Sequence, residues 1–596
     1  MFYSSPAVRV LRTTKTRMAS FISKCLLFSA FVSAHCYAQG TWTQIATHAP
    51  DNNAGVMLLL NDGSVLVKAG GGGTVGTGWD RLWPDIHGSY VNGSWTTAAG
   101  MADSRLYFSS HVLKNGLVYV AGGEYGTGRS KAEIYSPIDD MWFPTVAPVT
   151  DPTDTISDAN SAMLPDGRIL QAVVLTGHSV SRHTYIYDPV TSTFTPGPNT
   201  LGIDDETSWT KLPDNSILFA DLYASTTERY IPATNTWIHD ADIPLDLYDA
   251  YGYEAGASFI LPDGRAFFLG STSTSAYYTP SGNTTPGTWA VGPVIPDSLG
   301  APDAAAAMMP NGKILCAFSP TPTNDTVFYP KTKFFEFDYL TNTFTHILTP
   351  QGHDSASFPS YMTNMLMLPD GSVLYSTQND NKYYVYTPGG TPLAAGKPTV
   401  NNVYTDHCDT FTATGTLFNG ISEGASYGDD WQMATNYPIV RLSRHDSVFY
   451  ASTYNWNSTG LMRGTAPDTT QFVLPLGLDP GTYQLQVVAN GIASDPYSFT
   501  FCHTAGVSTV NKPAKKLNIF PNPASDEVTI EYNALHAGEY NIILTDVMGR
   551  KVVAEQHTAV TGKNINTINL TGIAPGIYNA SLIDGNNIYA EKVIVK

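Results

Sequence analysis

Acidic and aromatic residues recur at one position of a repeated pattern, shortly before a turn of the Asp-Gly or Asn-Gly type. The acidic residues there are Asp51, Asp158, Asp205, Glu206, Glu254 and Asp303, and tyrosines take the position at Tyr107 and Tyr361. Carboxylates accept hydrogen bonds from sugar hydroxyls, or they coordinate a hard cation such as calcium through oxygen. The pattern therefore predicts an acidic binding surface flanked by aromatic rings. Ordinary solvated loops are the alternative, because loops are polar in most proteins.

Seven similar hairpins must position these residues. Each has two short alternating apolar strands around the turn, as in "LPDGRILQAV" and "LPDGSVLYS". The turn residues are Asp62, Asn115, Asp166, Asp214, Asp263, Asn311 and Asp370, which lie 48 to 59 positions apart. A period of about 50 residues with short strands is typical of kelch-type β-propeller blades of four strands. The repeat therefore predicts a seven-bladed β-propeller.

A second repeated feature, an aromatic residue in another strand, supports the same count. These residues are Trp42, Trp95, Trp142, Phe194, Trp237, Trp289 and Phe344. Trp42 precedes the first turn, whereas no such strand follows the last turn. We therefore expect "TWTQIATHAP" to supply the outer strand of the last blade and to close the ring, rather than to be a linker with a stray aromatic residue. Since inner strands surround the channel of a propeller, the acidic and aromatic residues would line one mouth of it.

The pattern changes after the Gly- and Pro-rich segment "GGTPLAAGKPTV". Short alternating strands without the repeat favour an immunoglobulin-like β-sandwich over residues 396–504. A polar linker over 505–516 then leads to a small β-module over 517–596. The predicted fold class is thus all-β, with a propeller over 39–395 followed by a sandwich and a second, smaller sandwich.

The amino terminus has the order of a secretory signal, with Lys24, an apolar run and small residues up to Ala38. We expect a signal peptide over 1–38, and a start at Met18 would give it a more ordinary length. A membrane anchor is the alternative, but the run is short for a bilayer, and no other stretch predicts a transmembrane segment in the mature chain. The formal net charge of −19 argues against nucleic acid as a partner.

Removal of the signal peptide would leave Cys316, Cys408 and Cys502. These are too few for a disulfide scaffold and lack metal-binding spacing. Cys408 and Cys502 lie near opposite ends of the expected sandwich. They could pair in an oxidising compartment, and two reduced, buried thiols are the alternative. Cys316, in the apolar run "KILCAF", is expected in the core.

The last module resembles a known export signal. The segments "LNIFPNPASDEVTIEY", "ILTDVMGRKV" and "LTGIAPGIYNASL" are similar to the carboxy-terminal sorting domain of the type IX secretion system of Bacteroidetes-type bacteria. Phe520 to Pro523 match its opening motif, Asp546, Gly549 and Arg550 its central motif, and Gly576 and Tyr578 its penultimate strand. The resemblance implies that the secretion machinery recognises residues 517–596 and that the protein is released or attached at the cell surface.

The propeller and the first sandwich together resemble the galactose oxidase and glyoxal oxidase family, whose copper site uses tyrosines, histidines and a cysteine cross-linked to one tyrosine. The segment "RLYFSSHVLKNG" matches the family motif and implies that Tyr107 is the cross-linked tyrosine. In "GGEY", Tyr125 takes the place of a stacking tryptophan. The sandwich segment "VRLSRHDSVF" is similar to one that brings a histidine into the channel, which nominates His445 as a ligand.

Two positions depart from the family pattern. The cysteine is missing, since its place falls near Ala54. The family has Tyr-His before its last hairpin, whereas this chain has Tyr361 and Met362. A thioether is a soft ligand that favours reduced copper, so Met362 would weaken a Cu(II) site.

Two functions of different classes follow. The first is a secreted, non-catalytic propeller that binds a glycan or another surface ligand through the acidic mouth. The second is a copper oxidase-like enzyme with an altered site built from Tyr107, Tyr361, Met362 and His445. A structural surface protein and an unrecognised hydrolase stay open, although the sequence has no nucleophile elbow, zincin motif or phosphate loop.

Overall fold

A computed structural model describes most of the chain. The described residues are 1, 39–52, 54–69, 75–144, 154–157, 159–174, 181–204, 207–407, 410–424, 433–475, 478–501, 517–534, 537–546, 551–584 and 587–596. The predicted signal peptide beyond Met1, the linker and several named residues lie outside them. Those named residues are Asp158, Asp205, Glu206, Cys408, Cys502, Gly549 and Arg550.

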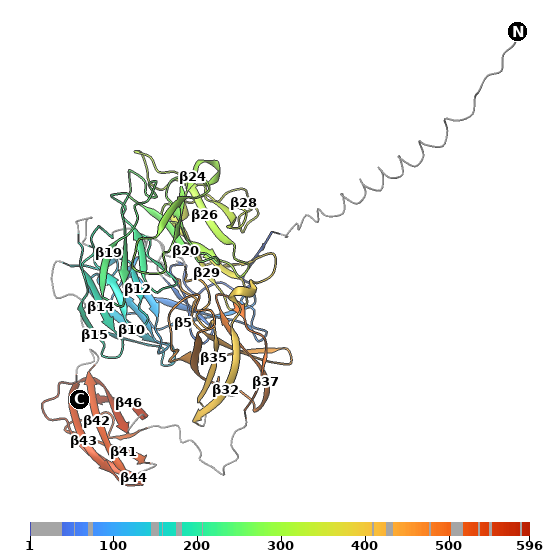
Figure 1. Ribbon diagram of the computed structural model, residues 1–596. Helices are drawn as coiled ribbons and strands as arrows, with labels where there is room; N and C mark the ends of the chain where they lie inside the picture. The colour runs from blue at the N-terminus through green and yellow to red at the C-terminus, as the bar shows by residue number, and fades with distance from the viewer. Residues whose placement is uncertain are drawn as a thin grey trace.

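The all-β fold class is confirmed. The helical elements of the described residues are three single 3₁₀ turns, η1 (Pro296–Ser298), η2 (Ser360–Met362) and η3 (Ala394–Gly396). Seven successive sheets of four or five strands precede the sandwich in the described part of the chain (Figure 1). From the first strand outward, the first four sheets are β2 (Met57–Leu59), β3 (Val65–Lys68), β4 (Trp79–Trp83) and β5 (Ser94–Ala98); β7 (Ser109–Val112), β8 (Val118–Ala121), β10 (Ala132–Ser136) and β11 (Met141–Pro144); β12 (Ser161–Met163), β13 (Ile169–Ala172), β14 (Thr184–Asp188) and β15 (Thr193–Pro196); and β16 (Thr210–Lys211), β17 (Ile217–Ala220), β18 (Thr227–Ile231) and β19 (Thr236–His239).

The other three sheets complete this series. They are β20 (Ala255–Ile260), β21 (Ala266–Gly270), β22 (Ser275–Thr279) and β23 (Thr288–Val291); β24 (Leu299–Gly300) and β25 (Ala306–Met308) beside β26 (Ile314–Pro320), β27 (Lys333–Asp338) and β28 (Thr343–Ile347); and β29 (Thr363–Met367), β30 (Val373–Thr377), β31 (Tyr384–Thr387) and β1 (Thr41–Gln44). A short ladder of β6 (Arg105–Leu106) and β9 (Tyr125–Gly126) lies outside them.

The repeated Asp or Asn residue explains why each hairpin turns where it does. Its side-chain oxygen accepts the backbone N–H two residues later in every one of the seven turns. The next residue is in the left-handed region, with φ of 78° at Gly63 and 66° at Asn215. Glycine and asparagine tolerate this region better than other residues, so the turn chemistry fixes the register of the first two strands.

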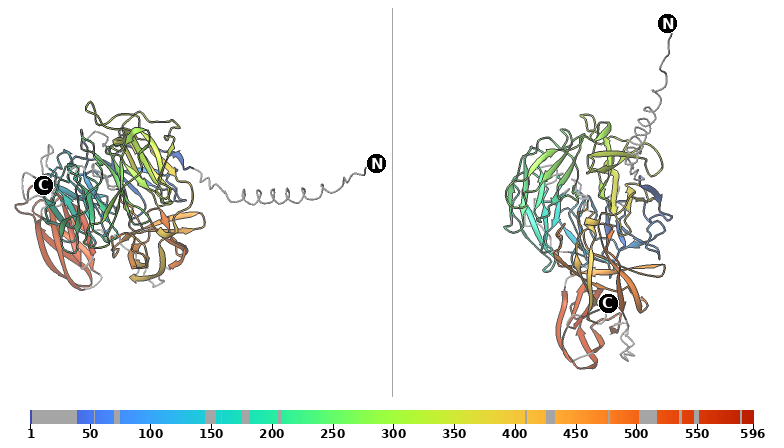
Figure 2. Two further views of the ribbon diagram at one scale, coloured as in Figure 1. Left: turned by 45° about the horizontal axis from the view of Figure 1, so that its top comes forward. Right: turned by 45° about the vertical axis from the view of Figure 1, so that its right-hand side comes forward.

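The seven sheets are joined into a ring (Figures 1 and 2). Hydrogen bonds link each sheet to the next: Arg105 N–H to Gly76, Ser109 to Ala159, Asn160 to Thr207, Ser208 to Gly256, Asp303 N–H to Ala255, Ser360 to Pro302 and Ser376 to Met57. The amino-terminal strand closes the last sheet, because Trp42 pairs with Tyr386 across β1 and β31. The predicted closing strand is thereby confirmed.

Replacing Trp42 with alanine is expected to destabilise the ring by about 3 kcal/mol, because a packed aromatic residue is lost from the closing strand. The Trp42 ring packs against Tyr386, Tyr375 and Phe334 at centroid distances of 4.6, 5.2 and 5.8 Å. Its N–H donates to the Leu348 carbonyl at 2.9 Å. Urea unfolding of the wild type and the variant measures the loss. Thr43→Ala, an exposed position of the same strand, is the control, and equal losses in both variants would contradict a closing role for Trp42.

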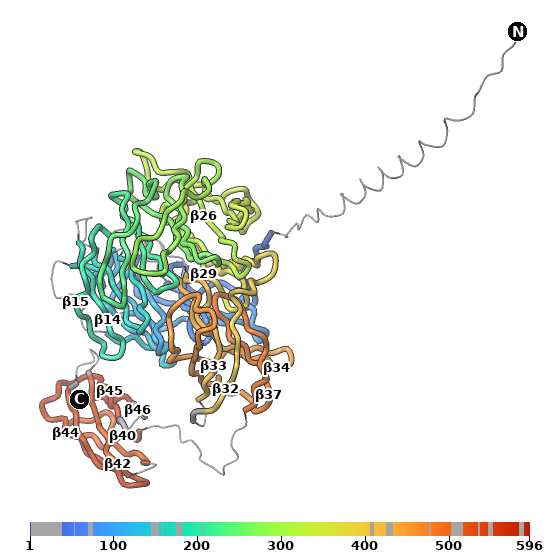
Figure 3. The backbone as a smooth tube through the Cα atoms, in the orientation of Figure 1, coloured from blue at the N-terminus to red at the C-terminus, as the bar shows by residue number. Residues whose placement is uncertain are grey.

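The first sandwich consists of eight connected strands. They are β32 (Thr399–His407), β33 (Thr410–Thr416), β36 (Pro467–Val473), β35 (Ser447–Tyr454), β34 (Ile439–Arg444), β37 (Gly481–Ala489), β38 (Ile492–Ala493) and β39 (Tyr497–Phe501). Phe411, Leu442, Val487 and Phe499 belong to its buried core. Figure 3 shows these strands beside the ring.

The sandwich contacts the ring on one particular side. Each first strand of the ring begins on one side, the mouth side, and ends at its hairpin turn on the other, the turn side. Asn61, in the turn after β2, donates to the Thr453 carbonyl at 2.6 Å, and Thr459 donates to Leu164, in the turn after β12, at 2.9 Å. The sandwich therefore covers the turn side and leaves the mouth side to the loops that precede the first strands.

The C-terminal module has its own core. One sheet contains β40 (Asn518–Phe520), β41 (Glu527–Ala534) and β44 (Gly562–Asn569), and the other β43 (Lys551–Ala559), β42 (Gly538–Asp546), β45 (Gly576–Asp584) and β46 (Asn587–Val595). Val528, Ile542 and Leu582 are fully buried within it. Asn522 holds the opening motif against β46, since its side chain donates to Lys592 and accepts from the Ile594 N–H.

Candidate binding site at the mouth of the ring

Tyr107 and Tyr125 are brought together on the mouth side by the ladder of β6 and β9. Leu106 pairs with Tyr125 in this ladder, and the Glu124 N–H donates to the Tyr107 carbonyl at 3.0 Å. The two tyrosine rings meet edge to face with centroids 6.3 Å apart. Tyr125 is 45% exposed and Tyr107 is half-buried, so this pair presents an aromatic surface to solvent.

The buried residue Arg105 holds this pair in place. Its guanidinium donates to the carbonyls of Gly122, Gly128 and Lys131 and pairs with Glu133 at 3.0 Å. It thereby ties the strand before Tyr107 to the loop that carries Glu124 and Tyr125. The sequence motif contains Arg105, but its structural role was not predicted because the three carbonyls come from a different part of the chain.

Replacing Arg105 with methionine is expected to lower the free energy of unfolding by about 3–5 kcal/mol, because Glu133 then stays buried without its cation. The double variant Arg105→Met/Glu133→Leu should lose less, since it leaves no unpaired buried charge. Chemical denaturation of both variants checks this. Lys131→Ala breaks an ion pair with Asp103 at a lysine that is 53% exposed, and it should change stability little. A double variant as unstable as the single one would contradict the explanation.

The loop before β20 presents a second aromatic surface. Asp249 is 2% exposed, and its carboxylate accepts the N–H groups of Tyr251, Gly252 and Glu254 at 2.8, 2.6 and 3.2 Å. The Tyr253 ring stacks on Tyr223 at 4.7 Å and faces Tyr248 at 6.0 Å. We call Tyr223, Tyr248 and Tyr253 the tyrosine cluster.

The tyrosine cluster combines residues from two sheets of the ring. Tyr223 follows β17 and the other two precede β20, so all three lie at the mouth-side ends of these strands. Tyr223 is 40% exposed and Tyr253 is 37% exposed. The cluster was not predicted as a unit, although "YGYE" is part of the repeated upstream segment, because stacking between two loops is not encoded in the spacing of either loop.

Glu254 and Asp303, two of the predicted acidic residues, meet beside this loop. The Asp303 N–H donates to the Ala255 carbonyl at 3.0 Å, and its carboxyl group is hydrogen bonded to that of Glu254. Burial raises the pKa of Asp303, and the nearby charges of Glu124 and Asp249 raise it further. Asp303 is 8% exposed, and its Oδ1 atom has no hydrogen-bond partner among the described residues.

The raised pKa of Asp303 predicts a dependence of stability on pH. The folded state binds this proton more tightly than the unfolded chain, whose aspartates titrate near pH 4. Stability should therefore fall as the pH rises above about 4 towards the raised pKa, and then level off. Asp303→Asn removes this loss and is expected to be more stable than the wild type at pH 8 by about 1–2 kcal/mol.

Melting temperatures measured between pH 4 and 8 test this prediction. Asp325→Asn, at an exposed position, is the matched control and should follow the wild-type profile. Parallel pH profiles for Asp303→Asn and the wild type would show that the carboxyl group carries no such penalty.

A separate group of charges lies at the mouth-side end of the first sheet. Asp51 is exposed, and its N–H donates to Asp80 at 3.0 Å. Lys68 is 1% exposed, and burial lowers its pKa to about 8, an effect that Asp51 partly opposes. Burial also raises the pKa of Asp80 to about 6. Burial thus disfavours the charged forms of both Lys68 and Asp80.

Tyr361 also lies on the mouth side, but its ring has different neighbours from that of Tyr107. It belongs to η2, directly before β29, and its ring packs on Phe328 with centroids 4.7 Å apart. Met362 is half-buried, and its backbone accepts the Gln378 N–H at 2.8 Å. Ala54 is buried at the place where the oxidase pattern has its cysteine, and Cys316 is a buried free thiol in the core, as expected.

His445 does not lie on the mouth side. It occupies the turn between β34 and β35 and is exposed. The neighbouring Asp446 carbonyl is 2.7 Å from His87 Nδ1, and the Val448 N–H donates to Ile86 at 2.8 Å. Ile86 and His87 join the two outer strands of the first sheet on the turn side. The expectation that this segment reaches into the channel was therefore wrong, because a hairpin sequence does not reveal which way its tip points.

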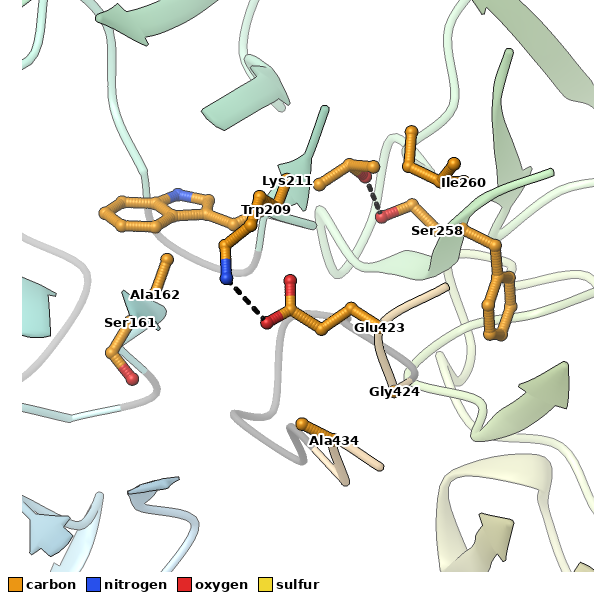
Figure 4. Close-up of a pocket in the computed structure, with 11 residues that line it drawn as sticks. Ser161, Ala162, Trp209, Lys211, Ser258, Ile260, Glu423, Gly424 and Ala434 are labelled. Carbon is orange, nitrogen blue, oxygen red and sulfur yellow. Dashed lines mark hydrogen bonds and ion pairs between the residues drawn. The ribbon is translucent and has the colours of Figure 1, made fainter. Parts of the chain in front are cut away.

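Another segment of the sandwich reaches the first strands of the ring. Lys211 on β16 is 3.0 Å from Glu423, and these two residues line a cavity of about 20 Å³ with Trp209 and Ser258 (Figure 4). A volume of this size holds a single water molecule. His111 lines a neighbouring cavity, where burial and then Lys211 lower its pKa to about 3, so it is neutral. Both cavities are about 20 Å³, too small for a ligand larger than water.

The described side chains contain no group of three or more His, Cys, Asp or Glu residues that could hold a metal ion. The oxidase resemblance needs Tyr107, Tyr361 and His445 around one ion, but His445 is on the opposite side of the ring. Tyr107, Tyr361 and His445 therefore do not fit the family's copper site. For calcium, Asp249 is already occupied by backbone N–H groups.

Comparison with known proteins defines the class of the C-terminal module. Residues 518–596 match the family described as "Secretion system C-terminal sorting domain". The protein is therefore exported to a secreted or cell-surface location, as the sequence predicted. None of the helices among the described residues is long and apolar enough to cross a membrane.

Another comparison is with solved structures. One similar solved structure is described as "Novel fungal alcohol oxidase with catalytic diversity among the AA5 family, in complex with copper". The TM-score is 0.45 at 15% identity, with 78% of this chain and 99% of that chain covered.

Proposed function

We propose that this secreted or cell-surface protein is a non-catalytic binding protein that holds a glycan, or another ligand of the cell surface, at the mouth of its ring. The observation that carries the proposal is the tyrosine cluster beside Glu254 and Asp303. Exposed, stacked tyrosine rings offer flat apolar faces with polar tips, and carboxylates accept hydrogen bonds from hydroxyl groups. A sugar has an apolar ring face that can pack on a tyrosine and hydroxyl groups that can donate to a carboxylate.

A glycan array tests the proposal directly. The secreted protein should bind at least one class of glycan, and Glu254→Gln/Asp303→Asn should reduce that binding. The absence of binding to every glycan would contradict the proposal, and so would equal binding by the wild type and the double variant.

The alternative function is a copper oxidase-like enzyme. It is favoured by Tyr107 and Tyr361, which match tyrosines of the family pattern in the sequence, and by the contact between Tyr107 and Tyr125. Met362, Ala54 and the position of His445 argue against it. Metal analysis after copper loading, combined with a peroxide-coupled screen of alcohols and aldehydes, separates the two functions. Stoichiometric copper with turnover would overturn the binding proposal.

A further inference from the structure

The charged groups that act on the Asp303 carboxyl group are all acidic. The ionisable groups that act on Asp303 are Glu254, Glu124 and Asp249, and no lysine or arginine is among them. The Asp303 carboxyl group is more than nine-tenths buried and its Oδ1 atom has no partner among the described residues. A buried polar atom without a hydrogen-bond partner destabilises the folded state unless a donor binds to it. The site therefore favours a ligand that carries hydrogen-bond donors and positive charge.

The geometry favours an organic cation over a metal ion. The described residues offer no cluster of three His, Cys, Asp or Glu residues for a metal. Both carboxylate oxygens of Asp249 already accept backbone N–H groups of the loop that it stabilises. An ammonium group needs fewer ligands, because one or two carboxylate oxygens at hydrogen-bond distance suffice for it. Glu254 is half-buried, so it remains accessible from the mouth.

The aromatic surface next to the acids favours a sugar over an extended peptide. Tyr253, directly before Glu254 in the chain, stacks on Tyr223 and lies near Tyr248, with ring centroids 4.7 and 6.0 Å apart. Asp249 fixes the backbone of this loop, so the rings need little further ordering when a ligand binds. A pyranose ring laid on these faces would place a substituent within reach of the carboxylates.

We propose that the ligand at the mouth is a glycan with free amino groups, such as a polymer of glucosamine, and that Glu254 and Asp303 accept hydrogen bonds from its ammonium groups. This inference rests on the proposed function of glycan binding. It excludes polyanionic glycans, which the acidic residues would repel.

Two oligosaccharides of equal length test the inference. Glucosamine hexamer and N-acetylglucosamine hexamer differ only in the free amine, and isothermal titration to the full-length secreted protein compares them. We expect the wild type to bind the glucosamine hexamer about tenfold more tightly, as one partly buried charge pair contributes roughly that factor. Glu254→Gln should lose most of this preference. Asp446→Asn, which removes one charge on the turn side, should keep it.

The outcomes separate this inference from the function on which it rests. Equal or tighter binding of the N-acetylated hexamer by the wild type overturns the amine assignment and leaves glycan binding intact. Binding of a lysine hexapeptide without binding of either oligosaccharide overturns both. The wild-type comparison needs no variant, so it remains decisive even if Glu254→Gln fails to fold.

Discussion

Deletion of residues 517–596 is expected to abolish delivery of the protein to the cell surface and the medium, and to retain it inside the cell. The matched family model covers this module, which has a separate buried core, and so its removal should leave the ring and the first sandwich folded. Fractionation of a type IX-competent bacterium followed by immunoblotting measures the loss.

A reporter fusion provides the converse control. A signal peptide and residues 517–596 attached to an unrelated soluble protein should direct that protein to the cell exterior. Normal surface delivery of the deletion variant would show that the module is dispensable for export.

Replacement of Tyr223 and Tyr253 by alanine is expected to weaken binding of the glucosamine hexamer by about 30- to 100-fold. The reason is the loss of the stacked pair, whose centroids are 4.7 Å apart, and of the apolar faces that it presents. Each buried aromatic contact at a binding site typically contributes about 1–3 kcal/mol. Titration calorimetry of the double variant measures the change.

Conservative and remote variants identify the cause of such a loss. Tyr253→Phe keeps the ring and should retain most of the affinity. Tyr404→Ala removes a tyrosine that is 45% exposed on the sandwich and should leave binding unchanged. A double alanine variant that binds as tightly as the wild type would remove the tyrosine cluster from the site.

The repeated parts of this structure were predictable because their signals are local. The Asp or Asn turn residues produce the same side-chain hydrogen bond at every hairpin, and Trp42 marks the strand that closes the last sheet. Glu254 and Asp303 were predicted at the mouth because each takes the repeated position upstream of a hairpin turn, and the ring brings these positions to the same side. Asp158, Asp205 and Glu206 lie outside the described residues and remain predictions.

The rest of the site depends on contacts between loops, which spacing along the chain does not encode. Tyr223 and Tyr253 stack across two sheets, and Arg105 gathers carbonyls from three positions of another loop. His445 was placed in the channel because its hairpin sequence was similar to one that enters a channel. The strand pattern was right, but the direction of the hairpin is set by the hydrogen bond of β35 with the loop that joins β4 and β5.

The pairing of β1 with β31 also determines when the ring can form. Trp42 donates to a carbonyl 306 positions later in the chain, and β1 pairs with β31, so β1 has no partner strand until almost the whole ring has been synthesised. Until then both ends of the series are open edges. Closure therefore couples the folding of the ring to the arrival of both ends of the chain in the same compartment.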